Sequence, residues 1–156
     1  MTSALRVIGV GNRWRSDDAV GLDVVDRLRD TLPAEVELME REGEPTSLID
    51  AWEGADAVWV VDAVSSGAEA GTLHRLDAGE RELPAELFRT STHHFGLAEA
   101  VELARAVGSL PKRFVVFGIE AGELGLGNTL SPAVADAVDR AAAAVREEVL
   151  GCTSTR

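Results

Sequence analysis

Three short runs of apolar residues are the clearest pattern in the chain. They are rich in valine and isoleucine and are bounded by glycine or polar residues: Leu5–Val10, Ala57–Val64 and residues 114–119. A strand that is apolar on both faces is buried on both faces, which is typical of a parallel sheet covered by helices on each side. The pattern therefore predicts three central strands of such a sheet.

Amphipathic helical patterns lie between and after these runs. Apolar positions spaced three and four residues apart predict helices over residues 17–29, 47–52, 96–106 and 131–150. Ser131 and Pro132 support the start of the last helix, because serine caps helices well and proline suits the first helical position. The alternation of strand and helix indicates the α/β class.

Two further segments alternate between apolar and polar residues, over 36–40 and 72–76, and are expected at the sheet edges. Residues 65–71 are too few for the crossover helix that a parallel return requires, so the strand that follows them should be antiparallel. The sequence thus predicts a three-layer sandwich. Its five-stranded twisted sheet is mostly parallel, with one antiparallel strand and helices on both faces.

Length and charge set the class of protein and its partners. A chain of 156 residues with 46% hydrophobic residues can bury the core of one domain, which we expect at 1–150 with a flexible tail over 151–156. The formal net charge of −12 disfavours nucleic acid and anionic membranes as partners. Cys152 is the one cysteine, and no signal peptide or membrane span is recognisable. We therefore expect a cytoplasmic protein.

The most informative polar segment follows the first predicted strand and opens the first helix. Gly9 and Gly11 allow a tight turn there, which raises the hypothesis of a flavodoxin-like nucleotide binder. The three-glycine fingerprint is incomplete, and Asp17 and Asp18 put negative charge where a phosphate would bind. Nucleotide binding is therefore the less favoured hypothesis, and saturable nucleotide binding would test it.

The acidic pair has a structural interpretation and a functional one. Ser16 or Asp17 could cap the helix, and Asp18 could stabilise the helix dipole. The functional interpretation is favoured by Asp62, which ends a buried apolar strand, where charge is rarely placed for packing. In a doubly wound sheet the ligand crevice lies where strand order reverses, here between the first and third strands. Asp18 and Asp62 should flank that crevice.

A histidine is expected at the same rim. His93 precedes the predicted helix 96–106, whose start should lie at the carboxyl ends of the parallel strands. A solvated position near a helix start is the simpler interpretation of either His93 or His94. Together, Asp18, Asp62 and His93 offer two carboxylates and an imidazole, an incomplete set suited to a divalent metal such as nickel or zinc. Water, substrate or a metal held by another protein would complete it.

These residues resemble the hydrogenase maturation proteases, endopeptidases that remove a C-terminal extension from the large subunit of nickel-iron hydrogenases. The resemblance rests on the order and spacing of short motifs, which are Gly9-Val10-Gly11-Asn12 with Asp17-Asp18 and Gly21, Val61-Asp62-Ala63, Ser91-Thr92-His93, Gly118-Ile119-Glu120 and Leu130-Ser131-Pro132. It implies that Asp18, Asp62 and His93 bind the metal and carry catalysis. The family often has glutamate where this chain has Asp18, so the shorter side chain must approach more closely or bind through water.

The resemblance also implies a substrate and a source of metal. The implied partner is the hydrogenase large-subunit precursor, which carries the nickel, and Trp14, Arg15 and residues 122–128 would border the groove for its extended segment. Two mechanisms remain open: the nickel polarises the scissile carbonyl or its bound water, or a carboxylate is the general base while nickel positions the substrate. The rival interpretation is a non-catalytic module that binds metal or precursor without cutting.

Overall fold

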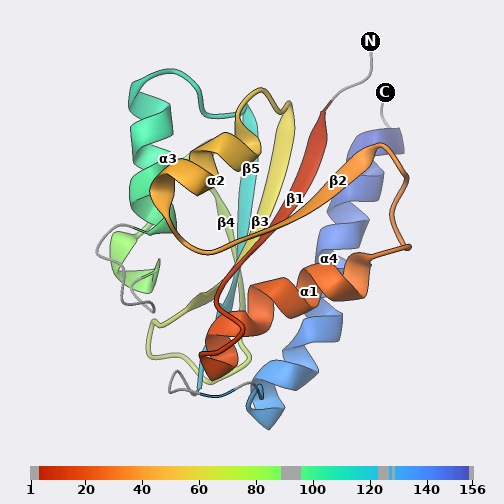
Figure 1. The fold of residues 1–156 in the computed structure, drawn as a ribbon, viewed down its shortest axis with the longest axis vertical. Helices are drawn as coiled ribbons and strands as arrows, with labels where there is room; N and C mark the ends of the chain where they lie inside the picture. Colours follow the sequence, from red (N-terminus) through yellow and green to blue (C-terminus); the bar gives the residue numbers. More distant parts are fainter. Residues whose placement is uncertain (1–3, 89–95, 123–126, 128, 155–156) are drawn as a thin grey trace.

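Five strands form one sheet in a computed structural model that describes residues 4–88, 96–122, 127 and 129–154 (Figure 1). The strands are β1 (Leu5–Val10), β2 (Val36–Arg41), β3 (Ala57–Val64), β4 (Leu73–Asp77) and β5 (Arg113–Glu120). Their order across the sheet is β2-β1-β3-β5-β4. β2, β1, β3 and β5 are mutually parallel, and β4 is antiparallel to β5. The predicted sheet, with β2 and β4 at its edges, is confirmed.

Helices cover both faces of the sheet, as the alternating pattern predicts. The helical elements are the 3₁₀ turn η1 (Ser16–Ala19), α1 (Val20–Leu28), α2 (Pro45–Trp52), the 3₁₀ turn η2 (Ala85–Phe88), α3 (Leu97–Ala106) and α4 (Pro132–Ser154). Figure 1 shows α1 and α4 on one face and α2 and α3 on the other. Within the described part of the chain, no helix combines the length and apolarity needed to cross a membrane.

The sheet separates two apolar cores, and β3 contributes to both. Trp59 and Val61 pack in the core under α1 and α4, whereas Val58 and Val60 pack in the core under α2 and α3. Every residue of β3 is buried, and each fully buried valine contributes roughly 1.5–3 kcal/mol. This burial on both faces holds the central strands in place and thereby positions the residues at their carboxyl ends.

Helix ends differ from the predicted ones. The first helix begins with the 3₁₀ turn η1 and ends at Leu28. α2 starts two residues earlier than predicted, at Pro45, because the Glu44 carboxylate accepts hydrogen bonds from the first backbone N–H groups of the helix. α4 continues to Ser154, so residues 151–154 are helical rather than part of a flexible tail. Cys152 packs against the core there and extends the apolar stripe of α4.

The reversal of β4 follows from the short connection that precedes it. Gly71 lies in that connection with φ at +87°, and a Cβ there would lie 2.5 Å from the carbonyl oxygen of Ala133 in α4. The Arg140 guanidinium, also on α4, donates to the Gly71 carbonyl at 3.1 Å. The connection is therefore fixed against α4, and β4 folds back beside β5.

Candidate active site

The candidate site lies where the strand order reverses, between the carboxyl ends of β1 and β3. From β1 the chain passes to β2 on one side of this point, and the strands that follow β3 lie on the other side. Gly21 brings α1 against this point, because a Cβ there would lie 2.2 Å from the carbonyl oxygen of Val61 and 2.6 Å from that of Val10. The close contact excludes any larger residue and holds the start of α1 over both strand ends.

Asp18 and Asp62 line one small cavity at this point. Their exposed fractions are 3% and 6%. The cavity has a volume of about 20 Å³ and is also lined by Gly11, Phe88 and Gly96, and a volume of this size holds one water molecule or one metal ion. Asp18 comes from η1 and Asp62 from β3, so the two predicted carboxylates are brought together.

The environment of Asp62 disfavours its charged form. Burial raises the pKa of Asp62 well above the ordinary aspartate value, and the negative charge of Asp18 raises it further. The Ala63 N–H donates to Asp62 Oδ1 at 2.8 Å, which lowers this pKa and offsets part of the increase. Two carboxylates at close range favour either a shared proton or a cation. The pair is therefore suited to proton transfer or to metal coordination.

The third predicted ligand, His93, lies outside the described residues, as does the neighbouring His94. The described chain borders the cavity on both sides of that segment, at Phe88 and at Gly96. Among the residues that the structure describes, no three His, Cys, Asp or Glu side chains are grouped so that they could hold a metal ion. Metal binding by the two aspartates with His93 therefore stays a prediction.

Asp17 does not cap the first helix, which corrects the structural interpretation of the acidic pair. It is fully buried, and neither η1 nor α1 has a side-chain hydrogen bond at its N-cap. Its carboxylate accepts hydrogen bonds from the Gly122 N–H (2.7 Å), the Ser131 N–H (2.7 Å) and the Ser131 hydroxyl (2.9 Å). Asp17 thus ties η1 to the segment between β5 and α4.

A second pairing joins the same two parts of the chain. The Gly127 N–H donates to the Trp14 carbonyl, and the Ser16 N–H donates to the Gly127 carbonyl, both at 2.9 Å. Arg15 and Gly127 form a parallel bridge. Of residues 122–128, which were expected to border a substrate groove together with Trp14 and Arg15, Gly127 lies beside both, and residues 123–126 and 128 lie outside the described chain. Their role in a substrate groove stays a prediction.

Glu120, at the end of β5, is the centre of a polar cluster that the sequence pattern did not predict. Its buried carboxylate accepts hydrogen bonds from the Ser66 N–H (2.7 Å) and hydroxyl (2.6 Å), and His74 Nε2 lies 3.1 Å from it. Burial raises the pKa of Glu120, but these hydrogen bonds outweigh it and leave the pKa below the ordinary glutamate value. The strand-end position of Glu120 was visible in the sequence, whereas His74 joins it only because β4 folds back.

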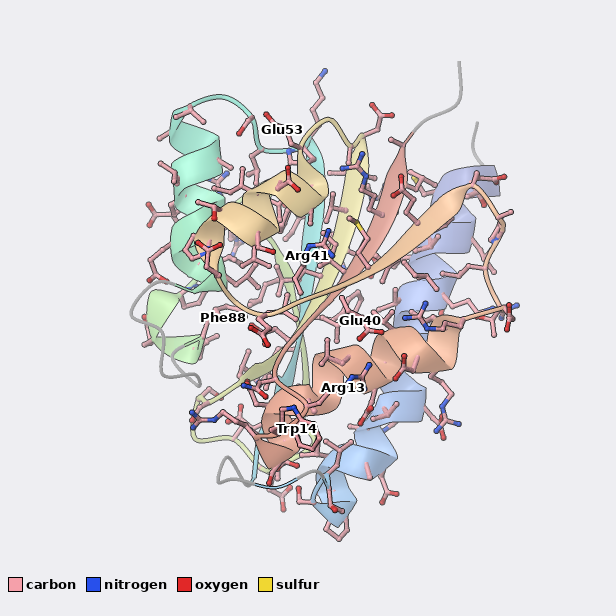
Figure 2. All side chains as sticks on the ribbon, viewed as in Figure 1. Arg13, Trp14, Glu40, Arg41, Glu53 and Phe88 are labelled. Atoms are coloured by element: carbon pink, nitrogen blue, oxygen red, sulfur yellow. The ribbon has the colours of Figure 1, made fainter. Side chains whose placement is uncertain are left out.

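A groove adjoins the cavity and shares Gly11 with it. The groove has a volume of about 240 Å³, and its lining includes Asn12, Arg13, Trp14 and Glu40. Figure 2 shows Arg13, Trp14 and Glu40 on the same side of the molecule, beside α1. The Arg13 guanidinium pairs with Glu40 at 2.6 Å and with Asp26 at 3.2 Å. The groove and the cavity of the two aspartates therefore adjoin at Gly11, and Trp14 lines the groove.

Comparisons with known proteins show the family. A family model described as hydrogenase maturation protease, HycI, matches residues 22–148. The chain is 35% identical over 147 residues to the hydrogenase expression/formation protein HupD of Rhodobacter capsulatus, covering 90% of this chain and 69% of that protein. It is 32% identical over 150 residues to the hydrogenase 2 maturation protease of Escherichia coli K12, covering 90% of each. The solved structure of the hydrogenase maturating endopeptidase HybD from E. coli matches with a TM-score of 0.79 and 27% identity, covering 97% of this chain and 92% of that chain. The chain belongs to the hydrogenase maturation protease family.

Proposed function

We propose that this endopeptidase removes a C-terminal extension from the nickel-loaded large-subunit precursor of a nickel-iron hydrogenase. Family membership and the names of the relatives support the reaction class. The observation that carries the proposal is the pair of buried carboxylates, Asp18 and Asp62, in one cavity at the strand-order reversal. The net charge of −12 supports a protein partner over nucleic acid or anionic membrane, and the single cysteine is consistent with the cytoplasm.

The nickel belongs to the substrate, and the two aspartates are suited to meet it. Their mutual repulsion raises the pKa of Asp62, and a divalent cation brought between them would relieve that repulsion. Carboxylate oxygens and an imidazole nitrogen are suitable ligands for nickel, and His93 is the imidazole that we assign to the set. A site with only these ligands leaves positions open for those that the precursor supplies.

Peptide hydrolysis requires a base for the attacking water and an acid for the leaving amine. In the route in which nickel only positions the substrate, a carboxylate pair with one shared proton provides both, because the ionised member accepts the proton of water and the protonated member delivers one to the departing nitrogen. In the other route the pair and His93 would hold the substrate's nickel, which would polarise the scissile carbonyl or its bound water. In either route we expect substitution of Asp62 to reduce the cleavage rate most, which makes the protease aspartate-dependent.

The test is cleavage of a purified large-subunit precursor, read by mass spectrometry. The wild-type protein should shorten the nickel-loaded precursor and leave the nickel-free precursor intact, and Asp62→Asn should reduce the rate by about 10²-fold to 10⁴-fold. Asp50→Asn is the matched control, since Asp50 is an exposed aspartate on α2, and it should cleave like wild type.

Three outcomes would change the assignment. A stable uncut complex with the wild-type protein would favour the non-catalytic binding module. Efficient cleavage of the nickel-free precursor by chelator-treated protein would remove the substrate's nickel from the mechanism. Full activity of Asp62→Asn would remove Asp62 from the catalytic pair.

A further inference from the structure

Trp14 is an exposed aromatic residue beside the candidate active site. Its side chain is 70% exposed, whereas Trp52 and Trp59, the other two tryptophans of the chain, are fully buried. A single exposed apolar side chain is ordinary, and Val107 at the end of α3 is also 70% exposed. The surroundings of Trp14 distinguish it from Val107.

The backbone that carries Trp14 is fixed on both sides of the residue. The Trp14 N–H donates to Asn12 Oδ1 at 2.9 Å, and its carbonyl accepts the Gly127 N–H at 2.9 Å. The Asn12 N–H in turn donates to the carbonyl of Asp18 at 3.3 Å, which joins the loop to η1. A backbone that is fixed in advance reduces the conformational entropy lost when a partner binds to the side chain that it carries.

Trp14 borders two hollows, and the first adjoins the cavity of the two aspartates at Gly11. The groove of about 240 Å³ contains Trp14 and shares Gly11 with the cavity of Asp18 and Asp62. A second hollow of about 200 Å³ is lined by Trp14 together with Ala19, Leu130 and neighbouring residues. A peptide that lies in the groove with one end at Gly11, beside the cavity, therefore meets the indole, which borders both hollows.

Two charged side chains of the groove, Arg13 and Glu40, are paired with charged neighbours. Arg13 pairs with Glu40 and Asp26, and Arg29 also pairs with Glu40, at 2.5 Å. The Arg41 guanidinium donates to the carbonyl of Glu40 at 2.8 Å. Arg41 and Glu42 also line the groove, and Trp14 is exposed beside them. The indole therefore offers a flat apolar surface on which an apolar side chain of a peptide would pack.

We infer that Trp14 anchors an extended segment of the hydrogenase large-subunit precursor. The segment lies in the groove from Gly11 onward and places an apolar side chain on the indole, while its scissile bond lies at the Gly11 end, next to the cavity of Asp18 and Asp62. The inference rests on the proposed function and adds a binding residue outside the carboxylate pair. Trp14 supplies affinity for the precursor and takes no part in bond cleavage.

The kinetic test separates binding from chemistry. Trp14→Ala should raise the KM for the nickel-loaded precursor by about 10- to 100-fold and leave kcat within about twofold of wild type, since a uniform binding contact changes KM alone. Trp14→Phe keeps a flat apolar ring and should recover most of the affinity. Val107→Ala is the control, because Val107 ends the helix whose opposite end borders the cavity, and it should match wild type.

A spectroscopic test detects the contact without cleavage. Protein labelled with 5-fluorotryptophan gives three ¹⁹F signals, one for each tryptophan of the chain, and the Trp14 signal is assigned by its loss in Trp14→Phe. Adding unlabelled nickel-loaded precursor to labelled Asp62→Asn protein should shift the Trp14 signal. The signals of the buried Trp52 and Trp59 should stay in place.

The two tests distinguish failure of the inference from failure of the proposed function. A Trp14 signal that does not move with precursor, or a Trp14→Ala variant with wild-type KM, overturns the inference even if the wild-type protein cleaves normally. A Trp14 signal that shifts on a precursor that the wild-type protein never cleaves supports the docking surface and removes the proposed reaction.

Discussion

Replacing Asp17 with alanine should destabilise the fold much more than loss of a helix cap would. Asp17 is fully buried, and its carboxylate accepts three hydrogen bonds from Gly122 and Ser131, on the segment between β5 and α4. The variant leaves those donors without this acceptor and removes one of the two described links between η1 and that segment, the other being the pairing with Gly127. The structural role of Asp17 therefore lies in a long-range contact.

The loss of stability expected from these hydrogen bonds is larger than the loss expected from a helix cap. A hydrogen bond to a charged group contributes about 1.5–3 kcal/mol, and the donors on Gly122 and Ser131 are only partly buried, so water replaces part of each bond. Three bonds of about 1–1.5 kcal/mol each give a loss of about 3–4.5 kcal/mol. A lost helix cap costs about 0.5–2 kcal/mol. The two explanations thus predict separate ranges.

Urea denaturation followed by circular dichroism measures the difference. Asp17→Ala should lower the midpoint at unchanged slope, and the melting temperature should fall by roughly 10 °C, since 1 kcal/mol shifts a domain of this size by about 2–4 °C. Ser131→Ala removes one donor and should lose about 1 kcal/mol, and its effect should largely disappear in the Asp17→Ala background. A loss below about 2 kcal/mol, or full additivity of the two substitutions, would refute the long-range role.

Three further substitutions test the rim of the sheet by denaturation. Asp62→Asn should raise the free energy of unfolding of the metal-free protein at pH 7. The pKa of Asp62 is raised in the fold, so the stability of the wild-type protein falls as the pH rises from about 4 toward the folded-state pKa, and asparagine avoids this loss. An equal gain at pH 3.5 would contradict this explanation. Glu120→Gln should destabilise at pH 7 by about 1–3 kcal/mol. Because the pKa of Glu120 is lowered in the fold, its contribution to stability is present above about pH 4.3 and is lost as the pH falls through the folded-state pKa. A stability difference between wild type and Glu120→Gln that stays constant with pH would count against the polar cluster. Gly21→Ala should cost about 1–3 kcal/mol despite the higher helix propensity of alanine, because its Cβ would lie 2.2 Å from the Val61 carbonyl oxygen; a gain in stability would show that α1 can move away.

The central strands and the position of the site could be predicted because they depend on local patterns. A continuous apolar run such as Ala57–Val64 has one stable environment, which is burial between two layers of helices. A short connection such as that before β4 forces an antiparallel return. The reversal of strand order follows from these connections, and an acidic residue at the end of a buried strand, Asp62, then marks the cavity.

The contacts that organise the rim could not be predicted, because they join residues far apart in the sequence. The donors to Asp17 lie 105 and 114 residues away, so the local pattern at the helix start favoured a cap. His74 is 46 residues from Glu120, and nothing in its own neighbourhood indicates a polar partner. Such pairs depend on the assembled order of strands, which places the start of β4 beside the end of β5.

The 3₁₀ geometry of η1 explains why two adjacent aspartates have different surroundings. With three residues per turn, successive side chains point about 120° apart, so Asp17 and Asp18 cannot both face the same part of the fold. Asp17 faces the start of α4 and receives hydrogen bonds there, whereas Asp18 faces Asp62 across the small cavity. The two positions should therefore respond in opposite ways: Asp17→Asn should cost stability, and Asp18→Asn should cost cleavage while lowering the pKa of Asp62, because it removes the neighbouring negative charge. Loss of cleavage from both variants, with both still as stable as wild type, would mean that the acidic pair acts as one unit.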